Sequence, residues 1–292
     1  MALSAGSVAA TRALLAATPS AGALTAAAVL DRIQQDRADQ WKLATDGTLK
    51  AGGPATPITG IVTTALASMS VLQAAVQAGA NMVITSEPLF FSKQDSPTPP
   101  VLPVAGAPLD PVVTAKAAFL QQHRMVVLRL KEPWNVQAPN PFVVGFAQDL
   151  RWMRYVDRSD PARLTLPAMP LEAFARVVKA RLGNRGGMRV VGDRHLVMRS
   201  VGFLPGSTPL QSALEMLPQV DVIVAGEVRE WETVEYVRDT VALGGRKALV
   251  YVGRVVSEEP GMRQCARWLQ TIVPEVRCSF LSAGDPYWRP TA

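Results

Sequence analysis

The sequence predicts two α/β domains with parallel-rich sheets, the first of them discontinuous. Three strand-like runs, at 82–85, 125–130 and 248–253, each end at a polar cluster and precede a helical stretch, which is the pattern of βα units. The chain has 292 residues, enough for two medium-sized domains, and its apolar content of 48% supports a sizeable core. Aromatic residues make up 6%, so Val, Leu and Ala must form most of that core.

The first predicted domain comprises residues 24–155 and 245–292. It begins with an amphipathic helix, because apolar residues recur on one side of 25–37. Residues 96–108 contain too many prolines for a regular element, since proline lacks an N–H donor and fixes φ, so we expect an insertion or lid there. In chain order the elements expected before the insertion of the second domain are helix 25–37, loop 45–57, strand 58–64, helix 70–79, strand 82–85, helix 110–123, strand 125–130 and helix 141–150.

The second predicted domain comprises residues 156–244. Its first part, 156–169, carries four charged residues and two prolines, which indicates a crossing between the domains. The next helix places Phe174, Val177 and Val178 on one face. The elements expected after the crossing are helix 171–182, strands 188–191 and 196–204, helix 209–217, strand 221–225 and a helix opening at 226–232, followed in the returning part of the first domain by strand 248–253, helix 257–272 and strand 276–281.

The charge and cysteine content exclude several classes of protein. The net charge is +6, but the arginines are spread along the chain without a run of five or six basic residues, so we do not expect nucleic-acid binding. Cys265 and Cys278 form no CxxC spacing and are interpreted as ordinary thiols. No uncharged apolar stretch reaches about 18 residues, so no membrane-spanning helix is expected.

Residues 1–23 are rich in Ala and Ser and contain a single charge, at Arg12. The short apolar stretch 13–17 resembles part of an export signal, but the basic start that such a signal needs is absent. We interpret the segment as a flexible arm or the remnant of an export signal. The protein is therefore expected to be cytoplasmic by default, and exported if the segment is a truncated signal.

Polar side chains follow the three strand-like runs and predict the site. The carboxyl ends of parallel strands gather at one crevice, where ligands bind. We therefore expect the site to combine Ser86, Glu87, Asn135, Arg254 and Glu258. A site of this layout is expected to hold histidines, and none lies in these segments.

The acidic segment that follows strand 221–225 has two interpretations. Glu227 and Glu230 could supply a general base next to the crevice. They could equally be acids in the first turn of a helix, where they interact favourably with its dipole. His123, at a helix end, and His195, in a predicted turn, are interpreted as surface residues.

Five motifs, in order along the chain, resemble those of one family. They are "IVTTALASMSVLQAAVQAGANMVITSEPLFF", "VGFLPGSTP", "DVIVAGEVREWE", "VYVGRVVSEEPGM" and "LSAGDPYW". In this order they resemble the Nif-three-like proteins, dinuclear-metal-centre hexamers often described as GTP cyclohydrolase I type-two homologues. The resemblance implies two α/β domains and a homohexameric ring built as a trimer of dimers.

The resemblance also implies a dinuclear metal site, and this chain departs from it. The family pattern has a His-His or His-Glu pair, a polar cluster, and a Gly-His-x-x-x-Glu motif, which fall on 86–87, 131–135 and 253–258. Glu87 and Glu258 therefore keep typical ligand chemistry. The positions where the family has histidine carry Ser86, Lys131, Asn135 and Arg254.

These replacements predict that the dinuclear site is weakened or lost. Zinc and iron prefer imidazole or thiolate ligands. Lys131 and Arg254 add positive charge where dications would lie, and at an effective dielectric of about 20 a unit charge at about 4 Å is worth about 4 kcal/mol, which a dication doubles.

Three interpretations of the remaining side chains stay open. Lys131 and Arg254 could pair with Glu258 and Glu87 as salt bridges. A divalent ion (Mg, Mn or Zn), weakly bound, could be held by Glu87, Asn135 and Glu258, whose oxygens suit a hard ion such as Mg²⁺. In the third, Lys131 and Arg254, with Ser86 nearby, would bind a small anionic substrate directly.

Two functions follow from these interpretations. The first is a ring-shaped binding or scaffold protein whose metal chemistry has been weakened or lost. The alternative is a metal-dependent hydrolase, acting like a type-two GTP cyclohydrolase or on a phosphate ester. In it Glu87 and Glu258 would hold a divalent ion, and Glu227 or Glu230 would act as general base.

Overall fold

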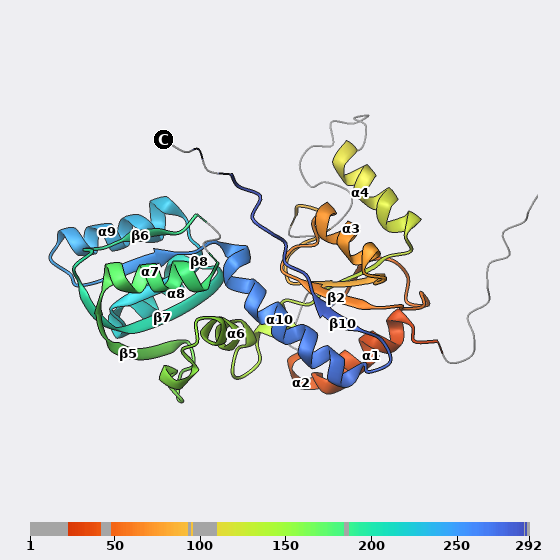
Figure 1. The fold of residues 1–292 in the computed structure, drawn as a ribbon, viewed down its shortest axis with the longest axis horizontal. Helices are drawn as coiled ribbons and strands as arrows, with labels where there is room; N and C mark the ends of the chain where they lie inside the picture. The colour runs from red at the N-terminus through yellow and green to blue at the C-terminus, as the bar shows by residue number, and fades with distance from the viewer. Residues whose placement is uncertain are drawn as a thin grey trace, which may run out of the picture.

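Two five-stranded sheets form the core of the described part of the chain, one in each lobe (Figure 1). The computed structural model describes residues 23–41, 48–92, 95, 110–183, 187–288 and 290. Helix α10 (Arg254–Ile272) runs from one lobe to the other (Figure 1). The predicted two-domain α/β fold is confirmed. Residues 1–22 of the predicted arm (1–23) and the proline-rich segment 96–108 lie outside the described residues.

The first sheet has the strand order β1-β4-β3-β2-β10. β1 pairs antiparallel with β4, and the other pairings are parallel. The strands alternate their side chains between two hydrophobic layers, one shared with α1 and α10 and the other with α3 and α4. The bounds are α1 Ala26–Asp36, α2 Ala38–Trp41, β1 Leu49–Ala51, β2 Ile61–Thr64, α3 Met69–Gln77, β3 Met82–Thr85, α4 Pro111–Gln122, β4 Val126–Arg129, α5 Glu132–Asn135 and β10 Cys278–Phe280.

The second sheet has the strand order β5-β7-β8-β9-β6. Its central strands β7, β8 and β9 are parallel, and both edge strands are antiparallel to their neighbours. Helices α6 and α7 cover one face and α8 and α9 the other. The bounds are α6 Pro141–Asp149, η1 Met153–Tyr155, β5 Arg163–Pro170, α7 Leu171–Arg181, β6 Arg189–Val191, β7 Val197–Ser207, α8 Leu210–Met216, η2 Leu217–Gln219, β8 Val222–Glu227, η3 Glu230–Val234, α9 Glu235–Ala242 and β9 Ala248–Tyr251.

Side-chain caps set several helix starts. The Thr25 side chain accepts a hydrogen bond from the Ala28 backbone N–H at the start of α1. Asp110 and Asn140 cap α4 and α6 in the same way, and in both helices a proline follows the cap, where its missing N–H costs nothing. These starts agree with the predicted helices to within one or two residues.

The structure corrects four sequence-based assignments. The predicted crossing contains β5, an edge strand whose Pro167 is tolerated because an edge strand has one unpaired side. The predicted loop 45–57 contains β1. β9 pairs with β8 and β6 in the second sheet, whereas residues 245–292 were assigned to the first domain. Helix α10 begins at Arg254, three residues before its predicted start at 257.

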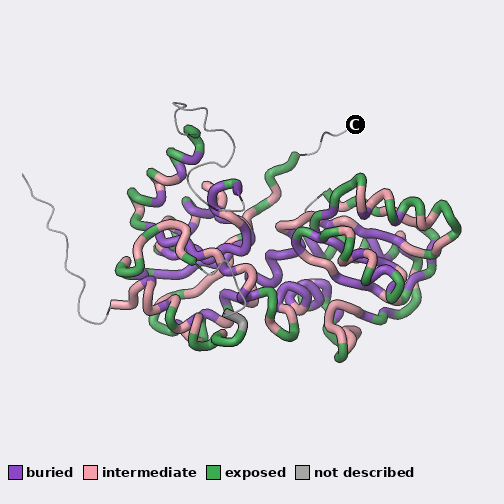
Figure 2. The backbone as a smooth tube through the Cα atoms, turned by 180° about the vertical axis from the view of Figure 1, so that it is seen from behind, coloured by how far each residue is buried: buried purple, intermediate pink, exposed green. Residues whose placement is uncertain are grey.

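Helix α10 brings polar groups into the interior between the sheets. All residues from Val256 to Met262 are buried, including two adjacent glutamates, Glu258 and Glu259 (Figure 2). The helix contacts β2 and β10 of one sheet, β7 and β8 of the other, and α6. Among the described helices none is both long and apolar enough to cross a membrane. The first half of α10 therefore positions buried carboxylates where the two sheets meet.

Candidate functional site

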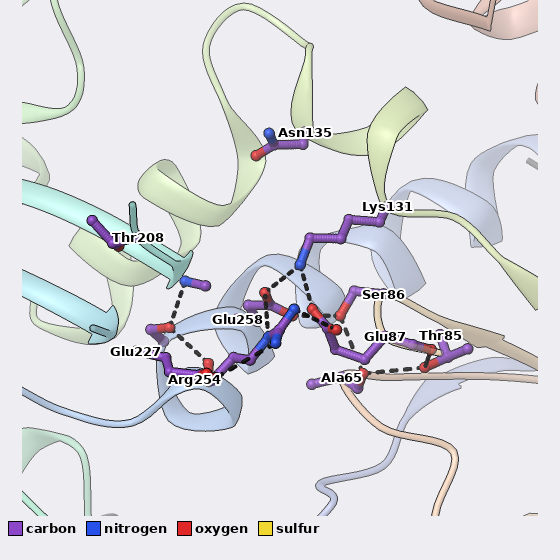
Figure 3. A network of polar contacts seen from close by, with 12 residues as sticks. Ala65, Thr85, Ser86, Glu87, Lys131, Asn135, Thr208, Glu227, Arg254 and Glu258 are labelled. Carbon is purple, nitrogen blue, oxygen red and sulfur yellow. Dashed lines mark hydrogen bonds and ion pairs between the residues drawn. The ribbon is translucent and has the colours of Figure 1, made fainter. Parts of the chain in front are cut away.

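Polar residues from both lobes meet at the start of α10 (Figure 3). Ser86 and Glu87 follow β3, and Lys131 follows β4, all at the carboxyl edge of the first sheet. Arg254 and Glu258 lie on α10, which follows β9 of the second sheet. The predicted convergence of strand ends is therefore observed, but it joins the ends of two sheets.

Lys131 lies between the two buried carboxylates. Its Nζ donates to Glu258 Oε1 at 2.8 Å and also to Glu87 Oε1. Glu87 is 3% exposed and Glu258 is 1% exposed, so the ammonium group bridges two buried carboxyl groups.

Arg254 supplies the second cation. Its guanidinium NH2 lies 2.6 Å from Glu87 Oε2, and its NH1 lies 3.4 Å from Glu227 Oε2 at the end of β8. Its Nε is 3.9 Å from Glu258 Oε1 and makes no hydrogen bond. Arg254 thus pairs closely with one buried glutamate and loosely with a partly exposed one.

Ser86 completes the surroundings of Glu258. Its Oγ donates to Glu258 Oε2 at 2.7 Å, and lies 3.2 Å from the backbone oxygen of Ala65. As a result every carboxylate oxygen of Glu87 and Glu258 has a lysine, arginine or serine partner.

Two glycines in the second sheet make room for α10. A Cβ on Gly226 would lie 2.4 Å from both the Gly206 backbone oxygen and Ser257 Oγ. A Cβ on Gly206 would lie 2.6 Å from Glu258 Oε1. The Ser257 hydroxyl accepts a hydrogen bond from Gly206 N at 2.9 Å, which fixes the helix against β7. Only strands without side chains at these points allow Glu258 to reach the cluster.

Burial and charge shift the pKa values of the two acids in opposite directions. Burial raises the pKa of Glu258 to about 7, although the charge of Lys131 acts against the shift. Burial also acts to raise the pKa of Glu87, but Lys131 and Arg254 outweigh it, and the pKa of Glu87 lies below its usual value. Glu87 is therefore the more acidic of the two carboxyl groups.

The cluster lies at the side of an open cavity of about 1670 Å³. Glu87, Lys131, Arg254 and Glu227 line this cavity, whereas Glu258 lies behind them. Such a cavity is large enough for a small-molecule ligand.

Two predicted site residues stand apart from the cluster. Asn135 lies on α5 and lines the same cavity, but its Oδ1 accepts from Asn140 Nδ2 at 2.7 Å, and no contact joins it to the glutamates (Figure 3). Glu230 lies on the π-helix η3, is exposed, and pairs with Arg189 at 2.5 Å outside the residues that line the cavity. Only Glu227 of the predicted general bases faces the cavity.

Sequence reasoning missed the residues that position the cluster. Gly206 and Gly226 have no side chain and Ser257 carries no charge, so residue type does not mark them as site residues. Residues 202–207 belong to the end of β7, where Gly206 lies against α10. Glu259, also missed, is fully buried and accepts hydrogen bonds from Ser282 Oγ and Ala283 N, which hold the C-terminal segment.

Ion pairs already occupy the two glutamates of the cluster. In the part of the chain that the structure describes, no group of three or more His, Cys, Asp or Glu side chains is arranged to hold an ion. The two acids that a metal would need are already bonded to Lys131 and Arg254. A dication would have to displace both cations, so the cluster is an ion-pair network and does not suit the dinuclear centre that the resemblance implies.

Comparison with known proteins identifies the fold. No protein-family model matches the chain, and no curated protein sequence matches it. Among solved structures the chain is similar to a Bacillus cereus protein related to NIF3, with a TM-score of 0.69, 15% identity and coverage of 92% of this chain and 99% of that one. It is also similar to protein ybgI, of unknown function (TM-score 0.67, 19% identity, 90% and 100% covered), and to a Staphylococcus aureus protein (TM-score 0.65, 16% identity, 91% and 99% covered).

These similarities place the chain in a structural class. It is a two-domain α/β protein with an ion-pair cluster between its sheets. At identities this low, the structural similarity shows a shared fold and nothing more. That fold is the fold of the NIF3-related proteins. The fold implied by the sequence motifs is therefore confirmed.

Proposed function

We propose that the chain is a divergent NIF3-like protein in which two built-in cations replace the dinuclear metal centre, and that it acts as a binding or scaffold protein. The observation that carries this proposal is the position of Lys131 between Glu87 and Glu258, with Arg254 on the other side of Glu87. The metal-dependent hydrolase is the alternative, and it requires a divalent ion at those two glutamates.

Electrostatics favours the binding or scaffold role. Each side-chain cation repels a dication at about 4 Å by about 8 kcal/mol at an effective dielectric of about 20. If Lys131 and Arg254 moved away to admit a dication, their ion pairs with the two buried glutamates would break. The Lys131 and Arg254 side chains therefore compete directly with any divalent ion for the same oxygens.

A homohexameric ring, assembled as a trimer of dimers, is part of the proposal. Large apolar side chains that are mostly exposed, Trp231, Tyr287 and Trp288, support burial against other copies of the chain. Sedimentation of the purified protein is expected to give the mass of a hexamer, and a monomer at all concentrations would remove this part.

Metal analysis of protein purified without chelators tests the central claim. We expect far less than one divalent metal ion per chain. A variant with histidine at all four positions where the family has it is expected to gain zinc or manganese binding, seen as a thermal shift with added ion, because imidazole is a better ligand than lysine or arginine. The four changes are Ser86→His, Lys131→His, Asn135→His and Arg254→His.

The matched control adds Glu258→Gln to the four histidines, which is expected to abolish the gain because it removes a carboxylate ligand. About two tightly bound metal ions per wild-type chain, the content of a two-metal site, would contradict the proposal.

A further inference from the structure

A smaller chamber adjoins the main cavity. It has a volume of about 300 Å³, and Asn135 and Ser207 line both spaces. The buried side chains of Val143 and Phe203 contribute apolar surface to it, and serine and threonine residues contribute hydroxyl groups. Among the described residues that line it, Asp160 is the charged one. The chamber therefore suits an uncharged group about the size of an amino-acid side chain.

A pair of opposite charges stands beside the junction of the two spaces. Glu227 lies in register with Ser207 on the neighbouring strand, and both line the main cavity. Glu227 and Arg254 approach each other at 3.4 Å, with side chains 48% and 33% exposed. A contact this long between partly solvated groups leaves both able to bind a further partner of opposite charge, while Arg254 NH2 stays paired with Glu87.

Side chains of both charges line the main cavity. Among the residues that the structure describes, four basic and four acidic side chains line it. A ligand of one sign alone would compete with a carboxylate or a cation of the protein for its partner. A ligand that carries both signs can insert between Arg254 and Glu227 and leave neither unpaired. Asn135 adds a donor at the junction, because its Oδ1 is held by Asn140 and its Nδ2 remains for a ligand.

From these three observations we propose that the cleft binds a free α-amino acid. Its carboxylate contacts Arg254, its ammonium group contacts Glu227, and its side chain enters the smaller chamber. This inference rests on the proposed function, because it requires that the Arg254 side chain face the cavity and that no metal ion be bound beside it.

The inference is tested with a panel of proteinogenic amino acids. Their binding to the purified protein is measured by calorimetry and by saturation-transfer NMR. L-phenylalanine is the reference probe, because its side chain is uncharged and the smaller chamber has a volume of about 300 Å³. Hydrocinnamate lacks its ammonium group and phenethylamine lacks its carboxylate, and each is expected to bind about tenfold more weakly or worse. Glycine, which has no side chain for the chamber, is expected to bind more weakly by a similar factor.

Single substitutions separate the two ends of the ligand. Glu227→Gln is expected to weaken the binding of L-phenylalanine about tenfold, because the contact to its ammonium group is lost. The affinity for hydrocinnamate, which has no ammonium group, is expected to stay unchanged. Glu230→Gln is the matched control, as Glu230 lies in the next turn but outside the cavity lining, and it is expected to change neither. Ser212→Phe, which fills the smaller chamber, is expected to weaken the binding of L-phenylalanine and to leave the binding of glycine unchanged.

Three results would overturn the inference: no saturable binding of any amino acid, binding of both analogues within about twofold of L-phenylalanine, or equal affinities in wild type and Glu227→Gln. The metal content of the same protein sample is measured in parallel. If the protein is free of metal and binds no amino acid, this inference alone is rejected. If two metal ions are bound per chain, the proposed function on which the inference rests is rejected.

Discussion

Replacing Glu258 by glutamine is expected to remove a large part of the pH dependence of stability between pH 4.5 and about pH 7. Glutamine has the shape of glutamate and can still accept from Lys131 and donate to Ser86 Oγ, so packing is kept. What the substitution removes is the buried group that titrates. It therefore isolates the electrostatic contribution of one side chain.

The magnitude follows from the shift in pKa. One pKa unit corresponds to about 1.4 kcal/mol, so a rise from 4.5 to about 7 corresponds to about 3 kcal/mol. The folded state binds this proton more tightly than the unfolded chain does. The stability that protonated Glu258 contributes is therefore complete below pH 4.5 and is lost as the pH rises to about 7. Glu87 has a lowered pKa, so its own contribution is lost only below pH 4.5.

Urea denaturation of wild type and variant across this pH range measures the effect. The free energy of unfolding of Glu258→Gln is expected to rise relative to wild type by about 3 kcal/mol between the acid and the neutral end. Parallel curves, with a constant difference between the two proteins, would refute the assignment of a buried, proton-binding carboxylate to this position.

Two further substitutions test the surroundings of the cluster. Lys131→Met is expected to lower the free energy of unfolding by about 3 kcal/mol at about pH 8. The loss is expected to be smaller at about pH 5, because a buried carboxylate can take up a proton there. Arg189→Met, which breaks an exposed ion pair, is the control and is expected to lower the free energy of unfolding by at most about 1 kcal/mol. An equal loss for both variants would show that burial adds nothing to the lysine pair. Gly226→Ala places a Cβ 2.4 Å from the Gly206 backbone oxygen and is expected to cost about 3 kcal/mol in thermal or urea unfolding, whereas Gly53→Ala, with its nearest atom at 3.9 Å, is expected to be nearly neutral. A stable Gly226→Ala protein would mean that α10 is not packed tightly against the sheet.

The sequence analysis missed two edge strands, β1 and β5, although it predicted the edge strands β6 and β10. β5 was hidden in a segment with charges and prolines, although Leu164 and Leu166 alternate with more exposed residues in the manner of a strand. An edge strand has one paired side, so its partner decides whether it forms. The short strand β1 was missed for the same reason, since it exists through its pairing with β4.

The start of α10 shows a second limit of sequence reasoning. Gly253 has a φ of 98°, which lets the chain turn from β9 directly into the helix. The predicted helix began later, at 257, because local residue types did not indicate how tightly the turn would close. The sheet to which β9 belongs was likewise decided by packing.

The residue types at the strand ends were sufficient to name most of the cluster. Ser86, Glu87, Lys131, Arg254 and Glu258 were all predicted to belong to one site, and the structure brings them into contact. Asn135 and Glu230 had equally suitable chemistry but lie outside the ion-pair network. Suitable chemistry next to a strand end is thus necessary for a place in the cluster but not sufficient.

The sequence by itself determined the fold class and the chemical identity of the cluster: carboxylates and side-chain cations where imidazoles were expected. Only the tertiary structure decided that one ammonium group lies between Glu87 and Glu258, which are 44 and 127 residues away from Lys131 in the chain. The physical reason is that these contacts depend on how α10 packs between two sheets. Local periodicity and residue type describe each segment separately and do not encode the distance between them.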